Sequence, residues 1–275
     1  MDNRITCAIH QPNLFPRLST VAKLYAADIW VVLDDVQFNH RDFQHRARLA
    51  TYDDVRRQQW LSLPVHKPFG RSTRINEVLL QEPDKSARRV RQLIYQYYGR
   101  APHWEVVDDL VSEVSAVVAL STRLVDVTEV STRLLLERLG WRGHVVRSST
   151  LTARPERSAR LADLTLAVGA DVYLCGTGGA KYLDEAPFGE CDLQVRYVSL
   201  PNGGCWRAGR EVSALCWMAE TAQAALQKVF DTGQRLSSRY AIPPSTSPGV
   251  YRSSRARTQP RSSAPSAATP AAPPP

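Results

Sequence analysis

The chain has 275 residues, of which 43% are hydrophobic, so it is long and apolar enough to bury a substantial core. Its formal net charge of +8 is unevenly spread, because the last acidic residue is Asp231 and six arginines follow it. The rest of the chain holds the other 29 of the 35 basic residues against 27 acidic ones, a net charge of +2. That balance is typical of an ordinary enzyme surface and disfavours nucleic-acid binding by the body of the protein.

The cysteines and the N-terminus indicate a reducing compartment. The five cysteines are odd in number, have no Cys-x-x-Cys spacing and lie scattered in apolar segments. Residues 1–10 lack the charged, apolar and cleavable regions of a secretion signal, and no stretch approaches 18 uninterrupted apolar residues. We therefore expect a cytoplasmic protein that does not insert into a membrane.

The predicted elements start with a strand at residues 5–9, a helix at 18–27 and a second strand at 29–33. Both strands are short apolar runs without alternation, which is typical of strands covered on both faces. A strand, a helix and a strand within about 30 residues form a βαβ unit. We therefore expect these two strands to be parallel, with a right-handed crossover.

Strands and helices continue to alternate along the chain, and glycines stand where several of the helices are expected to end. Residues 176–179, Gly-Thr-Gly-Gly, are expected to form the most flexible loop of the body. The pattern predicts an α/β fold, a Rossmann-like and mostly parallel sheet flanked by helices, with a helical subregion. The further predicted elements are a strand at 60–65, helices at 84–98 and at 105–139 with a break near Ser121, a strand at 144–147, a helix at 156–168, strands at 171–175 and 193–198, and a helix at 211–230.

The C-terminal segment differs sharply in composition from the rest. It consists mostly of Ser, Pro, Ala and Arg with almost no large apolar residue, so burial cannot offset the entropy of ordering it. We predict one α/β domain at residues 1–234 and a disordered tail at 235–275, which could serve as an arm that binds a partner.

Three polar clusters directly follow predicted strands, at residues 10–13, 34–38 and 175–179. The carboxyl ends of parallel strands open into one crevice, where ligands bind. We therefore expect the three clusters to share one pocket. In it, His10 would be the general base, Asp34 or Asp35 would orient a nucleophile, and the amides of the glycine loop would stabilise negative charge.

The stretch from His40 to Arg48 mixes basic and aromatic residues and could form an anion-binding wall for a phosphate, a carboxylate or a carrier phosphopantetheine. A solvated charged loop is the alternative. His40 and His45 lack a third ligand at suitable spacing, so no metal site is expected, and no motif identifies a cofactor. Cys175 is either a nucleophile or inert packing. The candidate substrate-binding residues are Gln11, Asn13, Gln37, His45, Arg46, Arg48, Ser158, Arg160, Gly176, Gly178, Gly179, Tyr182 and Asp184.

Four motifs together resemble the WbqC-like family over about residues 5–200. They are IHQPN at 9–13 with Pro16, LDDVQF at 33–38, ERSARL at 156–161, and GADVYLCGTGG at 169–179 with YLD at 182–184. That family is associated with bacterial O-antigen and other surface-polysaccharide gene clusters and with specialised-metabolite clusters. The resemblance implies a biosynthetic setting.

The sequence departs from the family pattern in places. The family usually has Ser at the position of Cys175, Pro at that of Thr177 and Asn-Arg-Asn-type residues near 45–47, and it has a Tyr/Pro-rich segment that is missing here after Pro201. The first βαβ unit and residues 148–150 are also similar in layout to nucleotidyltransferase-type folds, although the paired histidines of those sites are absent.

Three hypotheses for the function remain open. The first is a transferase that moves an activated acyl or aminoacyl group onto an amino sugar or a related acceptor, with a small-molecule or carrier-bound substrate. The second is nucleotide-dependent activation of a substrate, with phosphates held by the glycine loop and by Arg46 or Arg48. The third is a non-catalytic scaffold for other biosynthetic enzymes.

Overall fold

A computed structural model describes residues 4–233 and 235–237. The chain divides into two units, residues 1–240 and 241–275, and all of the described residues belong to the first. The predicted tail lies, apart from residues 235–237, outside the described residues, so its disorder stays a prediction. Among the described residues, no helix is long and apolar enough to cross a membrane.

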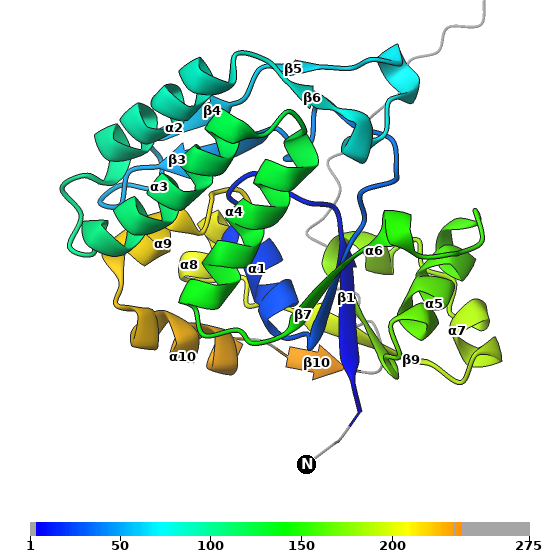
Figure 1. The fold of residues 1–275 in the computed structure, drawn as a ribbon. Coiled ribbons are helices and arrows are strands. Elements are labelled where there is room, and N and C mark those ends of the chain that lie inside the picture. The colour runs from blue at the N-terminus through cyan, green and yellow to red at the C-terminus, as the bar shows by residue number, and fades with distance from the viewer. Residues whose placement is uncertain (1–3, 234, 238–275) are drawn as a thin grey trace, which may run out of the picture. The chain divides into compact units, whose positions relative to one another are not determined.

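A six-stranded sheet in the order β10-β9-β8-β1-β2-β7 forms the centre of the domain (Figure 1). The five strands from β9 to β7 are mutually parallel, and β10 pairs with β9 in the antiparallel direction. This confirms the predicted α/β fold with a mostly parallel sheet flanked by helices. The strands are β1 Thr6–His10, β2 Ile29–Val32, β7 His144–Arg147, β8 Val172–Gly176, β9 Gln194–Ser199 and β10 Arg235–Ser237.

The predicted βαβ unit is present, because β1 and β2 pair in parallel on either side of the helix α1 in the chain. The predicted helix at 105–139 is two helices, α3 and α4, separated at Ser121 as expected. The helices are α1 Leu18–Tyr25, α2 Pro83–Tyr98, α3 Trp104–Leu120, α4 Leu124–Arg138, α5 Arg157–Ala167, α6 Thr177–Ala180, α7 Ala186–Glu190, α8 Cys205–Gly209, α9 Leu215–Glu220 and α10 Gln223–Gly233.

Two hydrophobic clusters cover the two faces of the sheet. Along β1, Ala8 belongs to the cluster that contains α1, while Cys7 and Ile9 belong to the cluster that contains α5 and α7. Successive side chains of a strand point to opposite faces, so His10 falls on the same face as Ala8. The strand period therefore turns His10 toward α1, and Figure 1 shows α1 and α5 on different sides of β1.

Two small antiparallel pairs lie outside the main sheet. They were not expected, apart from the predicted strand at 60–65, which overlaps β4 of the first pair at residues 60–62 and reaches the start of β5 at residue 65. In β3, the half-exposed Arg46 and Arg48 alternate with the buried Ala47 and Leu49, a period-2 pattern hidden within a charged stretch. The remaining elements are β3 Arg46–Ala50, β4 Gln58–Ser62, β5 Val65–His66, β6 Leu79–Leu80, and the 3-10 turns Gly70–Ser72, Ile75–Glu77 and Ser148–Thr150.

Three expectations differ from the structure. The predicted helix at 211–230 starts later, at Leu215, because Ser213 pairs with Arg17 of the N-terminal region, and it is divided between α9 and α10 at Thr221, whose backbone is extended. The predicted loop at 176–179 is one helical turn, with Gly176 at its start. The strand β10 was not anticipated, because three residues are too few to show a period.

Candidate functional site

The three polar turns singled out in the sequence lie at one edge of the sheet. His10 ends β1, Asp34 follows β2 and Gly176 ends β8, and β8, β1 and β2 are adjacent parallel strands. The three turns are therefore neighbours at the carboxyl ends of parallel strands, as expected. The side chains nevertheless divide into two groups, since His10 and Gly176 line a cavity and Asp34 does not.

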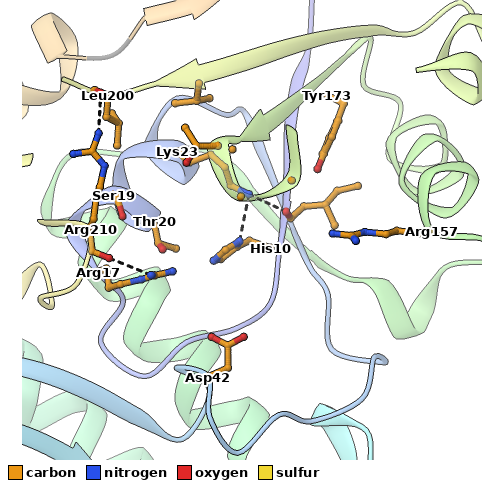
Figure 2. Close-up of a pocket in the computed structure, with 16 residues that line it drawn as sticks. His10, Arg17, Ser19, Thr20, Lys23, Asp42, Arg157, Tyr173, Leu200 and Arg210 are labelled. Carbon is orange, nitrogen blue, oxygen red and sulfur yellow. Dashed lines mark hydrogen bonds between the residues drawn. The ribbon is translucent and has the colours of Figure 1, made fainter. Parts of the chain in front are cut away.

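The cavity has a volume of about 580 Å³ and lies above β1, β8 and β9 (Figure 2). Its charged residues come from four separate parts of the chain, so no local motif could predict them. The lining is formed by Ile9, His10, Arg17, Ser19, Thr20, Lys23, Asp42, Arg157, Tyr173, Gly176, Thr177, Gly178, Gly179, Val198, Leu200 and Arg210.

A buried pair of nitrogen groups lies at the floor of the cavity. Lys23, from the last turn of α1, is 7% exposed. Its Nζ donates a hydrogen bond of 2.9 Å to the carbonyl oxygen of Ile9 and lies 3.3 Å from Nδ1 of His10. No carboxylate of the described residues forms an ion pair with Lys23, so its charge is compensated only by these dipoles.

Burial changes the proton affinity of both members of this pair. It lowers the pKa of Lys23 from 10.5 to about 8. Burial, reinforced by the positive charges of Lys23 and Arg17, lowers the pKa of His10 well below 6.5. At pH 7 His10 is therefore neutral, and its Nε2 atom is buried without a hydrogen-bond partner among the described residues.

The rest of the lining is strongly cationic. Arg17, Arg157 and Arg210 surround the His10–Lys23 pair, and Figure 2 shows His10 between Arg17 and Arg157. Asp42 is the one carboxylate among the described residues that line the cavity. With three guanidinium groups, an ammonium group and one carboxylate, the cavity favours an anionic ligand.

Backbone contacts fix two of these arginines. Arg17 donates a hydrogen bond of 3.1 Å to the carbonyl oxygen of Arg210 and stacks on the Phe43 ring at 4.2 Å. Arg210 itself donates to the carbonyl oxygens of Leu200 and Trp206, each at 3.1 Å. Carbonyl groups hold a guanidinium in place without neutralising it, so both side chains keep their positive charge for a ligand.

Two glycines give close packing where β8 meets α6. A Cβ atom at Gly176 would come within 3.2 Å of Cδ of Lys23, and one at Gly179 would come within 3.2 Å of Sγ of Cys175. The absence of side chains therefore lets the turn close over the lysine. Gly178 and Gly179 also line the cavity and present their backbone to it.

Asp34 and Asp35 belong to a separate polar network next to the cavity. Asp34 is buried and accepts hydrogen bonds from the hydroxyl groups of Ser148 and Ser149 and from the Ser149 amide. Asp35 accepts a hydrogen bond of 2.6 Å from Ser148 and pairs with Arg160 of α5. Both carboxylates therefore tie the end of β2 to the turn at Ser148–Thr150, Asp35 also ties it to α5, and neither lines the cavity.

The remaining candidate residues lie outside this cavity. Those that take part in contacts within the protein are Gln11, bonded to Gln44; Asn13, whose carbonyl oxygen accepts from Ser131 and Thr132; Gln37, bonded to the carbonyl oxygen of Arg71; Arg48, paired with Glu211; Ser158, which accepts from the Asp184 amide; and Tyr182, which stacks on Arg157. His45 and Arg46 line a second cavity.

Cys175 is unsuited to nucleophilic chemistry. Its side chain is buried in the cluster on the α5 face of the sheet and does not line the cavity. Burial raises the pKa of its thiol above the ordinary value, so the thiolate is scarce at neutral pH. The Cys175 side chain packs against Gly179, so its role is structural.

Comparison with known proteins identifies the family. A sequence profile of the WbqC-like protein family matches residues 11–207. The chain belongs to the WbqC-like family. This WbqC-like chain is also 25% identical over 229 residues to the Mycobacterium tuberculosis protein named "Uncharacterized protein Rv1507c", covering 82% of this chain and 93% of that protein. No solved structure matches it.

Sequence reasoning missed Lys23, Arg17, Asp42 and Arg210 as site residues. Lys23 stands within the apolar run of α1, where its neighbours Ala22 and Leu24 are also buried. A lysine in such a run is the available signal, because lysine is seldom buried without a functional reason. Arg210 and Asp42 carry no local signal, since only the tertiary fold brings them to the cavity.

Proposed function

We propose that this WbqC-like protein is a biosynthetic transferase that moves an activated acyl or aminoacyl group onto the amine of an amino sugar or a similar small acceptor. The observation that supports this most strongly is the buried Lys23 beside His10 in a cationic cavity. A phosphate or carboxylate on the donor or acceptor would bind Arg17, Arg157 and Arg210.

The His10–Lys23 pair would act as a proton relay. The acceptor amine attacks the acyl carbon, the C–N bond forms, and the bond from that carbon to the sulfur or oxygen of the leaving group breaks. The amine proton passes to Nε2 of His10 while the proton on Nδ1 passes to Lys23 as a neutral amine. The leaving group then takes up a proton, which restores the relay.

The relay explains why a histidine with a depressed pKa can serve as a base. A doubly protonated His10 would lie beside Lys23 and Arg17, which is unfavourable. Passing the second proton to Lys23 avoids that state, and the pair then behaves as a base with the pKa of the lysine, about 8. Such a value suits proton removal from an attacking amine near neutral pH.

Asp42 and the two buried aspartates have different roles in this proposal. Asp42 lines the cavity and is placed to bind the acceptor amine. Asp34 and Asp35, which the sequence suggested as groups that orient the nucleophile, are positioning residues here, because Asp34 fixes the turn at Ser148–Thr150 and Asp35 holds α5 and thereby Arg157 at the cavity.

The test is a mass-spectrometric screen of coenzyme A thioesters and other acyl donors against a panel of amino sugars. We expect an amide product with the wild-type protein and a loss of about 100-fold or more with His10→Gln, the usual contribution of a general base. A His10→Gln variant as active as wild type, or thiol release without amide formation, would contradict the proposal. Heat on titration with ATP or CTP and magnesium, without acyl transfer, would favour nucleotide-dependent activation instead.

A further inference from the structure

A second cavity, of about 520 Å³, lies between the β3–β5 region and the start of α2. No described residue lines both this cavity and the one around His10. The segment from His40 to Arg46 runs between the two cavities. Asp42 lines the first cavity, while His40, His45 and Arg46 line the second. The basic and aromatic stretch noted in the sequence therefore faces a hollow that the proposed reaction does not use.

The charged groups of the second cavity are mainly positive. Arg46, Lys85 and Arg89 face Glu82, which forms an exposed ion pair with Lys85 at 3.2 Å. Arg46 donates to the carbonyl oxygens of Arg41 and Asp42 and stacks on Trp60, none of which neutralises it. Arg89 forms no ion pair with any described residue. The lining thus carries an excess of two positive charges.

A buried histidine lies against these cations. His45 is 4% exposed and is held between the stacked ring of His40 at 4.5 Å and the edge of Phe38 at 5.5 Å. Burial, and then repulsion from His40 and Arg46, lower the pKa of His45 to about 4, so the ring is neutral at pH 7. Its Nδ1 is buried with no hydrogen-bond partner among the described residues, and an unpaired buried polar atom is unfavourable.

We propose that this second cavity binds the phosphate group of a small molecule, at a site separate from the one around His10. A phosphate supplies the multiple negative charge that would balance the excess of two positive charges left by Arg46, Lys85 and Arg89 against Glu82. The neutral His45 ring offers a hydrogen bond that requires no change of protonation. The site also lies at the N-terminal turns of the 16-residue helix α2, whose dipole favours an anion. Binding here does not depend on the reaction proposed above.

The test uses the full-length protein and inorganic pyrophosphate, followed by calorimetry and by ¹⁵N spectra of the histidine rings. Arg89→Gln removes one charge from the cavity, and Arg88→Gln is its matched control, because Arg88 is exposed on the same helix and lines neither cavity. We expect Arg89→Gln to weaken binding about tenfold, the value of one charge-assisted hydrogen bond. We expect Arg88→Gln to change it less than about twofold, because salt screens a distant surface charge. The His45 ring signals, identified with His45→Phe, should shift on addition of pyrophosphate.

Three results would overturn the proposal. One is equal weakening by Arg88→Gln and Arg89→Gln, which would mean general surface attraction. Another is binding that shifts the His10 signals and leaves those of His45 unchanged, which would place the anion in the first cavity alone. The third is failure of both UDP and 4′-phosphopantetheine to displace pyrophosphate. Displacement by one of the two at concentrations about tenfold lower would support the proposal and identify the source of the phosphate.

Discussion

Replacing Lys23 by methionine should make the protein more stable at neutral pH while removing its proposed activity. The ammonium group is buried without a carboxylate partner, and burial lowers its pKa from 10.5 to about 8. A shift of that size corresponds to about 3 kcal/mol of destabilisation in the protonated state. Methionine has a similar length and no charge, and it gives up the hydrogen bond to Ile9, worth about 1 kcal/mol. We expect a net gain of about 2 kcal/mol at pH 7.

The sign of the pH dependence follows from the lowered pKa. Between pH 8 and 10.5 the unfolded chain keeps a proton on Lys23 that the folded chain has released, so the stability of the wild type rises with pH in that window. Below pH 8 the penalty is present in full. The advantage of Lys23→Met should therefore shrink as pH rises, and the two proteins should be about equally stable at pH 10.

Urea unfolding followed by tryptophan fluorescence at pH 7 and pH 10 measures this difference. Subtracting the two proteins removes the effect of every titrating group that they share. Leu24→Met, a buried change without charge on the same helix, is the control, and it should change stability by less than about 1.5 kcal/mol at both pH values. A Lys23→Met variant that is less stable than wild type by the same amount at both pH values would refute the reasoning.

Three further substitutions separate packing from chemistry. Asp34→Asn places a side-chain amide among the hydroxyl and amide donors of Ser148 and Ser149, so we expect the free energy of unfolding in urea to fall by about 1–3 kcal/mol. The control Asp53→Asn changes an exposed carboxylate and should alter it little. Cys175→Ser should leave activity within about twofold, because the thiol is protonated and outside the cavity; a loss of about 100-fold would point to nucleophilic catalysis. Gly176→Ala pushes a methyl group against Lys23 and should shift the lysine pKa measured by NMR; an unchanged pKa would show that the turn yields freely.

The sheet and its edge were predictable because they rest on local patterns. Residues 29–33 form an unbroken apolar run, and such runs belong to strands covered on both faces. Once β1, β2 and β8 are parallel, their carboxyl ends must meet at one edge, so His10 and Gly176 could be placed together before any coordinates were known.

The identity of the cavity's charged residues was not predictable in this way. Asp34 and Asp35 stand at the correct edge, yet Ser148, Ser149 and Arg160 occupy their carboxylates, and this depends on contacts more than 100 residues away in the chain. Arg210 reaches the cavity only because residues 211–214 fold back against the N-terminal region. Long-range packing of this kind leaves no mark on a window of sequence.

The strand β3 has a pattern that was present in the sequence and overlooked. Arg46 and Arg48 alternate with Ala47 and Leu49, but the density of charge in this stretch favoured interpretation as a loop. Their guanidinium groups lie over the Trp60 ring at 4.3 and 4.6 Å, so cation–π contacts keep charged side chains on the outer face of the pair.

The most direct test of the account is a ¹⁵N NMR titration of the His10 ring between pH 6 and pH 10, which requires no substrate. We expect the imidazole to stay neutral throughout and its Nδ1 signal to move with a midpoint near pH 8, when the Lys23 ammonium beside it loses its proton. In Lys23→Met that step should disappear. A His10 ring that titrates near pH 6.5 like a free imidazole, or an Nδ1 signal that does not change near pH 8, would contradict the coupling on which the proposed chemistry depends.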